Sequence, residues 1–199
     1  MEKNFNEAVQ NRRSYYAISK EKVLPDKEII SLIEDAVKYA PTAFNSQSAR
    51  AVVLLGTEHE KLWDETMEIL RAIVPAKNFA ATEEKINSFR NGYGSILYFE
   101  DQSIVTGLQE NFPLYKDNFP VWSLESSGML QFIVWTALES KGYGASLQHY
   151  NPLIDEKVAA NWNIPKNWKL LAQMPFGKPT ATSDEKTFLP LDERVKVFK

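Results

Sequence analysis

The sequence contains no cysteine and two histidines, His59 and His149. The missing thiols exclude disulfides, thiolate nucleophiles, iron–sulfur clusters and cysteine zinc sites. The histidines stand in neither the His-x-x-x-His nor the His-Glu-x-x-His spacing that places two metal ligands on one helix face. We therefore expect no metal site and no side chain equipped for covalent chemistry, and any redox reaction must belong to a bound cofactor.

Long apolar runs and a strong charge of one sign are missing too. The longest apolar candidate, residues 129–138, is interrupted by Gln131 and is shorter than a membrane span. The first residues lack the apolar core of a signal peptide. A net charge of −3 provides no broad basic face for nucleic acid. These absences predict a cytoplasmic protein whose partners include neither a membrane nor a nucleic acid.

The composition that remains fits one folded domain over residues 1–199. Hydrophobic residues make up 44% and charged residues 25% of the chain, as in ordinary globular proteins. A chain of this length can bury a core without disulfides. Five tryptophans, eight tyrosines and eleven phenylalanines are a high aromatic content. Most should lie in the core, but some could also contact a flat ligand.

Hydrophobic periodicity predicts helices that alternate with short strands. Asp26 is expected to cap the second helix, and His59 to lie at the surface where the third begins. Residues 113–120, bounded by prolines, are expected to form a loop. These elements indicate an α+β or α/β fold. Helices are expected over residues 5–9, 26–40, 58–74, 83–90, 121–141 and 154–162, and strands over 51–56, 95–100, 145–147 and 168–174.

Two further segments favour a homodimer. Residues 121–141 are apolar on nearly every side, which is typical of a helix buried in a core or at a subunit interface. Residues 176–199 form a polar, extended tail with Pro179 and Pro190. Such a tail would be loose on a monomer unless it packs on a partner.

Two short polar segments interrupt the helical pattern. The guanidinium groups and hydroxyl of the first suit a phosphate, and the carboxamides of the second suit the edge of a heterocycle with alternating C=O and N–H groups. Either alone could be ordinary, as helix-end cations or as a turn. Joined by a helix that could place both against one ligand, they indicate a nucleotide-like cofactor. The segments are Arg12-Arg13-Ser14 and Asn45-Ser46-Gln47.

The order of these motifs resembles the FMN-dependent nitroreductase family. Members begin with a helix ending in Arg-x-Ser, followed by a helix that closes on Pro-(Ser/Thr) and an Asn-Ser-Gln segment, as residues 40–47 do here. Their long central helix ends in Gly-x-Gly before a strand that passes the flavin, which residues 142–150 match. Residues 177–190 are similar to the family's Gly-x-Pro and Lys-x-x-x-Pro pattern. The chain looks most like a small subgroup related to fungal fatty-acid-repression proteins and bacterial stress-induced nitroreductases.

The resemblance implies an α+β, nitroreductase-like fold with a central, mostly antiparallel sheet flanked by helices. Two chains would form an intertwined homodimer with flavins at the interface. FMN would be held at its phosphate by Arg12, Ser14 and Lys186, with Arg13 as a further candidate. Its ring would be bonded by the Asn45-Ser46-Gln47 segment, and one face would be lined by Gln148, His149 and Tyr150.

Two departures from the family pattern concern the phosphate site. Tyr16 and Phe188 stand where the family often carries basic residues. With fewer positive charges near the phosphate, the affinity for FMN should be modest.

The activity implied by the resemblance is hydride transfer from NADH or NADPH through FMN to a nitroaromatic, quinone or peroxide-like acceptor. The flavin would carry the chemistry, so no catalytic side chain is expected. The nicotinamide would visit as a substrate, because no dinucleotide fingerprint is present. Aromatic content alone suggests Phe44, Tyr115, Phe119 and Trp122 for the acceptor pocket. Two alternatives stay open: a flavin-binding regulatory or sensor protein with little turnover, and a module that binds a flat hydrophobic ligand without flavin.

Overall fold

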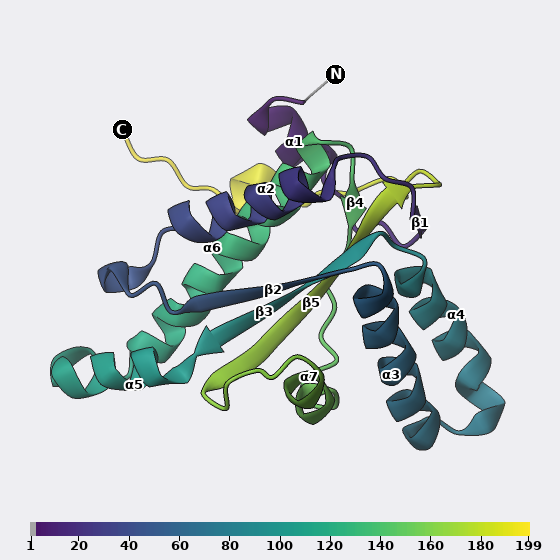
Figure 1. Ribbon diagram of the computed structural model, residues 1–199. Coiled ribbons are helices and arrows are strands. Elements are labelled where there is room, and N and C mark those ends of the chain that lie inside the picture. The colour runs from purple at the N-terminus through teal and green to yellow at the C-terminus, as the bar shows by residue number, and fades with distance from the viewer. Residues whose placement is uncertain (1–2) are drawn as a thin grey trace.

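In the computed structural model, which describes residues 3–199, an antiparallel sheet carries helices on both faces (Figure 1). This is the α+β architecture that the sequence predicts. The helices are α1 (Phe5–Asn11), α2 (Asp26–Tyr39), α3 (Thr57–Ile73), α4 (Phe79–Arg90), α5 (Gln102–Asn111), α6 (Phe119–Ser140) and α7 (Asp155–Asn161). The strands are β1 (Ile18–Ser19), β2 (Ala49–Leu55), β3 (Gly94–Asp101), β4 (Gly144–Ala145) and β5 (Trp168–Pro179). Short 3₁₀ turns include η1 (Ala43–Asn45) and η3 (Pro113–Tyr115).

β3 lies in the middle of the sheet and is buried along its whole length. The strand order is β1-β5-β3-β2, every neighbouring pair is antiparallel, and β4 also pairs with β5. Ile96 of β3 is opposite Val53 of β2 on one side and Met174 of β5 on the other. β2 therefore forms one edge of the sheet within the described chain.

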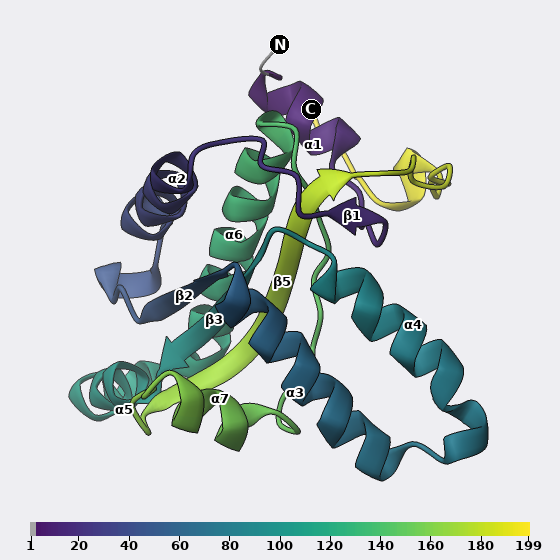
Figure 2. The ribbon, with the colours of Figure 1, turned by 45° about the vertical axis from the view of Figure 1, so that its right-hand side comes forward.

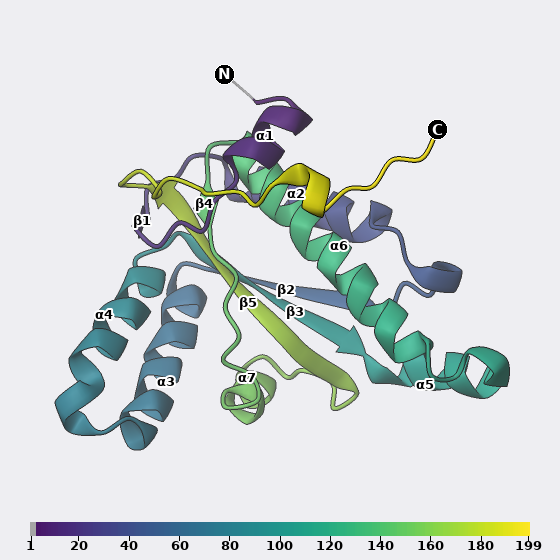
Figure 3. The ribbon, with the colours of Figure 1, turned by 180° about the vertical axis from the view of Figure 1, so that it is seen from behind.

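Each face of the sheet has its own core. On one face α2 and α6 bury Ile33, Leu130 and Val134 against the sheet. On the other, α3, α4 and α7 surround Trp63 and Phe89. Figures 2 and 3 show α3 and α4 as a pair on one side, with α2 and α6 on the opposite side. Full burial of one such side chain contributes about 1.5–3 kcal/mol, so both cores are large contributors to stability.

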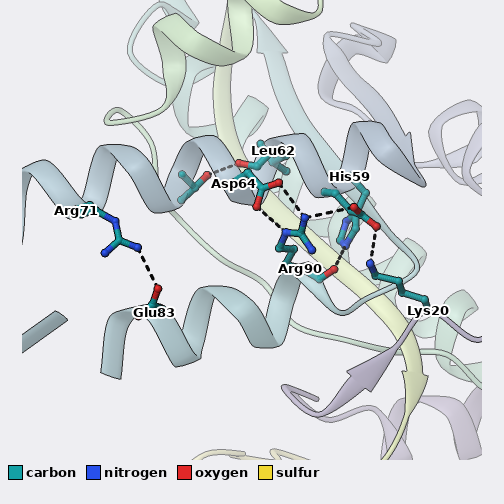
Figure 4. A network of polar contacts seen from close by, with 9 residues as sticks. Lys20, His59, Leu62, Asp64, Arg71, Glu83 and Arg90 are labelled. Atoms are coloured by element: carbon teal, nitrogen blue, oxygen red, sulfur yellow. Dashed lines mark hydrogen bonds and ion pairs between the residues drawn. The ribbon is translucent and has the colours of Figure 1, made fainter. Parts of the chain in front are cut away.

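A polar network closes the α3–α4 side (Figure 4). His59 is 1% exposed, its Nδ1 lies 2.9 Å from Ser95 Oγ, and its Nε2 lies 3.3 Å from the Arg90 carbonyl oxygen. The expectation of a surface histidine is therefore wrong, because the start of α3 faces β3. Burial lowers the pKa of His59 to about 4, so the ring is neutral near pH 7. The Arg90 guanidinium in turn binds Asp64 at 2.6 Å and Glu60 at 3.4 Å.

Several element boundaries differ from those that the sequence predicts. Asp26 does not cap α2, because Pro25 occupies that position and the Asp26 carboxylate binds Lys22 and Tyr93 instead. α5 was not predicted, although Asp101 caps it by accepting from the Ser103 N–H at 3.1 Å. β5 continues to Pro179, where β1 pairs with its end.

The long helix α6 is not covered on all sides within one chain. Leu124, Met129 and Phe132 are 40–54% exposed on its outer surface. In the tail, Phe188 is 73% and Phe198 93% exposed. Neither α6 nor any other helix within residues 3–199 has the length and apolarity to cross a membrane. The homodimer stays a prediction, and these exposed apolar side chains are where it would form.

Candidate functional site

The Arg-Arg-Ser segment is fixed to the sheet by its backbone. Ser14 forms a parallel bridge with Ala145, and the Tyr15 N–H donates to the Ala145 carbonyl at 3.0 Å. The approach is close at Gly144, where a Cβ would lie 2.7 Å from the Tyr15 ring. A side chain at position 144 would therefore displace the Tyr15 ring. The segment that the sequence assigns to phosphate is thus held by main-chain contacts at the sheet edge.

Arg13 and Ser14 open into a recess of about 400 Å³ between residues 13–17 and the start of the tail, residues 181–184. Arg13 is the positively charged residue that lines this recess, and Asp184 lines it from the tail. A guanidinium beside a hydroxyl in a recess of this size can accept a phosphate. We call this the phosphate recess.

The other two predicted phosphate ligands are placed differently. Arg12 lies with its guanidinium 4.3 Å from the Trp135 ring centroid, a cation–π contact. Burial and the neighbouring Arg13 lower the pKa of Arg12, which Glu139 partly offsets. Lys186 lies in the exposed tail with its Nζ 5.3 Å from the Phe188 ring and does not line the phosphate recess.

The predicted Gln148–Tyr150 segment lies beside the same edge. Gln148 is buried and exchanges two backbone hydrogen bonds with Gln173, at 2.7 and 2.9 Å. The Tyr150 N–H donates to the Gln173 side-chain oxygen at 2.7 Å, whereas His149 is exposed. Burial raises the pKa of Tyr150 to about 12, with a further contribution from Tyr16.

The Tyr16 and Tyr150 rings both pack on Phe89, with centroids at 5.9 and 6.5 Å. The structure therefore brings the Arg-Arg-Ser and Gln-His-Tyr segments together. We call residues 13–16 and 148–150 the phosphate-side strip.

The Asn-Ser-Gln segment has an unusual backbone. Phe44, Asn45 and Gln47 have φ values of 57°, 50° and 49°, the left-handed region that non-glycine residues rarely adopt. Thr42 holds the turn, because its hydroxyl accepts from the Gln47 N–H at 3.1 Å and its carbonyl from the Asn45 N–H at 3.0 Å. Both carboxamides are exposed. Strained backbone of this kind clusters at ligand sites, where the surrounding structure holds it in place.

Aromatic rings gather around this turn. Phe44 lies 5.2 Å from Phe119 and 6.0 Å from Tyr115, and stacks on Trp122 at 6.1 Å and 18°. The four aromatic residues singled out in the sequence are thus together. Phe112, at 5.1 Å from Phe44, completes the group but was missed. A neighbouring recess of about 460 Å³, lined among others by Phe44, Trp122 and Glu125, is wide enough for a planar ring.

The two predicted halves of the cofactor site lie apart in a single chain. Arg12 contacts Trp135 of α6, whereas Phe44 contacts Trp122 of the same helix. These tryptophans are 13 positions apart, which corresponds to roughly 20 Å along a helix. Figure 3 shows α1 near one end of α6 and the turn that follows α2 near the other. The phosphate recess shares no lining residue with the recesses beside residues 42–47.

Two charged residues near the turn were missed from the sequence. Glu100 is 1% exposed, and neither of its carboxylate oxygens has a hydrogen-bond partner within residues 3–199. Burial raises the pKa of Glu100 more than Ser48 and Arg50 lower it. The Arg50 guanidinium binds the Gln47 carbonyl at 2.7 Å and Asp101 at 3.0 Å. A charged residue at the end of an apolar, strand-forming run was the available signal for both.

Comparison with known proteins gives consistent matches over nearly the whole chain. The model of the nitroreductase family matches residues 9–178. HBN1 and the nitroreductase FRM2, both from Saccharomyces cerevisiae, are 37% and 36% identical over 191 residues, which cover 94% of this chain and 93% of each relative.

Solved structures agree with these sequence matches. The nitroreductase CinD from Lactococcus lactis, in complex with 4-nitrophenol, is 46% identical with a TM-score of 0.90, covering 98% of this chain and 100% of CinD. A protein from Exiguobacterium sibiricum in complex with FMN has a TM-score of 0.71 at 15% identity, covering 98% of both chains. At that identity the likeness shows the fold alone.

Proposed function

This chain belongs to the nitroreductase family of oxidoreductases, and from that premise we propose that it uses bound FMN to pass a hydride from NADH or NADPH to an aromatic acceptor. The observation that carries the proposal is the pairing of a phosphate recess at the sheet edge with a strained turn that exposes two carboxamides. These groups fit the two ends of FMN, since guanidinium and hydroxyl suit its phosphate and carboxamides suit its ring edge.

The residues near the sheet edge would hold the phosphate and one ring face. Arg13 and Ser14 are the direct phosphate ligands that the geometry favours. Arg12 and Lys186, both in nearby segments, would add positive charge at this end. The backbone of residues 148–150 would line one face of the ring, and the carboxamides of Asn45 and Gln47 would bond its edge.

We infer that one site takes its two halves from two chains. The phosphate-side strip and the carboxamide turn lie roughly 20 Å apart along α6 in one chain. A homodimer in which each flavin lies between the strip of one chain and the turn of its partner would join them. The exposed apolar side chains of α6 and the tail support such an interface, because large apolar side chains gathered on a surface are typical of protein contacts.

When bound, FMN supplies a ring atom that accepts and donates hydride. The protein would orient the nicotinamide and then the acceptor against the same ring face. Phe44 and Trp122 would stack the acceptor and exclude water from it. CinD was crystallised with 4-nitrophenol, with chloramphenicol and with nicotinic acid, which supports a nitroaromatic acceptor and a site for pyridine-type rings. Use of one site in turn predicts parallel lines in double-reciprocal kinetics.

The visible spectrum of the purified protein tests this function. We expect flavin absorbance after addition of FMN, bleaching by NADH or NADPH without oxygen, and recovery on addition of 4-nitrophenol or a quinone. A bound flavin that reduces slowly and is not reoxidised by these acceptors would indicate a regulatory or sensor protein. A protein that binds no flavin would overturn the proposal and favour a module for flat hydrophobic ligands.

A further inference from the structure

Arg50 is placed where the carboxamide turn enters the sheet. It is the second residue of β2, and its side chain is 27% exposed. One guanidinium nitrogen, Nη1, donates to the Gln47 carbonyl at 2.7 Å and to the Ala49 carbonyl at 3.0 Å. The other, Nη2, donates to Asp101 Oδ2 at 3.0 Å. One planar group thus spans the turn and the end of β3, which suits the fork geometry of arginine.

Asp101 is a firm anchor for this contact. Its other oxygen, Oδ1, accepts from the Ser103 N–H at 3.1 Å, from Ser103 Oγ at 2.6 Å and from Asn167 Nδ2 at 2.6 Å. Although burial raises the pKa of Asp101, these hydrogen bonds outweigh it and keep that pKa below its usual value. The carboxylate is therefore charged at neutral pH, and three hydrogen bonds to Oδ1 hold it in place independently of Arg50.

The turn needs such support. Phe44, Asn45 and Gln47 all lie in the left-handed region, and strained backbone of this kind persists only where neighbouring contacts offset its cost. The hydrogen bonds to Thr42 fix the backbone N–H groups of Asn45 and Gln47. Arg50 fixes the one remaining polar backbone group of Gln47, its carbonyl. The direction of that carbonyl sets the orientation of the peptide group between Gln47 and Ser48.

We propose that Arg50 is a positioning residue: by tying the Gln47 carbonyl to Asp101 it orients the carboxamides of Asn45 and Gln47 toward the flavin ring. The inference rests on the proposed function, because it assumes that these carboxamides bond the ring edge. Arg50 acts on the ring end of the ligand and has no contact with the phosphate recess.

The test is titration of FMN and riboflavin into wild-type, Arg50→Ala and Arg50→Lys proteins, followed by flavin fluorescence. Arg50→Ala should weaken both flavins by the same factor, about tenfold or more, since a charge-assisted hydrogen bond is lost. The ratio of the two dissociation constants should stay at its wild-type value, and the midpoint potential of the bound flavin should shift. Arg50→Lys should be intermediate, because an ammonium group cannot span both acceptors as a fork.

Arg71 offers a matched control. Like Arg50, which binds Asp101 and lies 5.6 Å from the Trp168 ring centroid, Arg71 contacts both a carboxylate and an aromatic ring. Its guanidinium lies 3.0 Å from Glu83 and 4.3 Å from the Phe79 ring centroid. It belongs to α3 and pairs with Glu83 of α4, on the face of the sheet opposite α2 and α6 (Figure 4). Arg71→Ala should leave both affinities and the flavin potential unchanged. An equal loss in this control would assign the effect to general stability and overturn the positioning role.

The remaining outcomes separate the two proposals. If the wild-type chain binds no flavin, the proposed function fails and this inference falls with it. If the wild type binds FMN but Arg50→Ala and Arg50→Lys bind both flavins equally well, with unchanged potential, the positioning role alone is overturned. Weakening of FMN without riboflavin would place the effect at the phosphate and also overturn it. Should Arg50→Ala fail to fold by circular dichroism, Arg50→Lys and Asp101→Asn give the same comparison.

Discussion

The two faces of the sheet differ in how completely their helices are buried within one chain. On the α3–α4 face, Trp63 and Phe89 are fully buried and the His59 network pairs the polar groups between the helices. On the α2–α6 face, the inner side of α6 is buried but Leu124 and Phe132 remain exposed on its outer side. The α3–α4 pair closes the first face with contacts within one chain, and we call it the closed face. The second, which we call the open face, has exposed apolar side chains and a recess, features that are typical of surfaces that contact partners or ligands.

The largest effect should come from removing the tail. Deletion of residues 181–199 leaves β5, its pairing with β1 and the Thr180–Ala17 hydrogen bond intact, because the strand ends at Pro179. We expect loss of both the dimer and bound flavin, since one wall of the phosphate recess and the exposed apolar residues of the tail are removed. Light scattering and flavin absorbance measure the two losses. A truncated protein that remains dimeric and yellow would show that the tail does not serve the open face.

The next largest effect should come from removing a phosphate ligand. Arg13→Ala should weaken FMN by about 1.5–3 kcal/mol, the worth of a charge-assisted hydrogen bond, and leave riboflavin unchanged. Arg12→Ala should have a smaller effect on the same ratio, because that guanidinium lies on Trp135. Calorimetric titration with both flavins measures this. Equal weakening of FMN and riboflavin by Arg13→Ala would refute the assignment of the recess to phosphate.

The closed face predicts a pH dependence of stability. His59 has a pKa of about 4 when folded and about 6.5 when unfolded, so the unfolded chain binds more protons between these values. The stability that neutral His59 provides is complete above pH 6.5 and is lost as the pH falls toward 4. Between pH 7 and pH 5 the loss should be ~2 kcal/mol.

Urea unfolding at both pH values measures this loss, with His59→Gln as the control. Glu100 and Asp155 have pKa values raised by burial and shift stability in the opposite direction. The comparison between wild type and variant removes their contribution. An identical pH dependence in both proteins would contradict the account of His59.

The smallest effect on stability should come from breaking a surface ion pair on the α3–α4 face. Arg71 and Glu83 pair at 3.0 Å, with nearly half of each side chain exposed. Exposed pairs of this kind contribute about 0–1 kcal/mol. Glu83→Gln should therefore change the free energy of unfolding by less than the loss of His59, and salt should reduce the difference further. A larger cost than that of His59→Gln would mean that the closed face depends on its surface ion pairs.

The sequence predicts elements with a strong local pattern better than contacts between distant segments. The stripe of Ile29, Ile33 and Ala36 predicts α2, and all three are buried. β1 has two residues and exists because the end of β5 lies beside it, which no local pattern shows. In the sequence His59 looks like a surface residue, because it lies in the first turn of a helix between Glu58 and Glu60. Its burial depends on Ser95 in a later strand.

The candidate site divides in the same way. The residue types of the Arg-Arg-Ser and Asn-Ser-Gln segments could be recognised from the sequence, as could the aromatic group around Phe44. Their separation along α6 could not, because it depends on which end of that helix each segment contacts. Arg50 was missed for the same reason, since its partner Asp101 is 51 positions away in the chain.

A mixed dimer tests most directly whether the site is completed by a second chain. Arg13→Ala and Asn45→Asp chains with different tags are co-expressed, and the heterodimer is purified through both tags. If each site joins the strip of one chain to the turn of the other, both changes fall in one site and the second site is intact. The heterodimer should then bind one FMN tightly per two chains, whereas each variant homodimer binds it weakly. A heterodimer with no tight site would show that each chain forms its own site and would contradict the account.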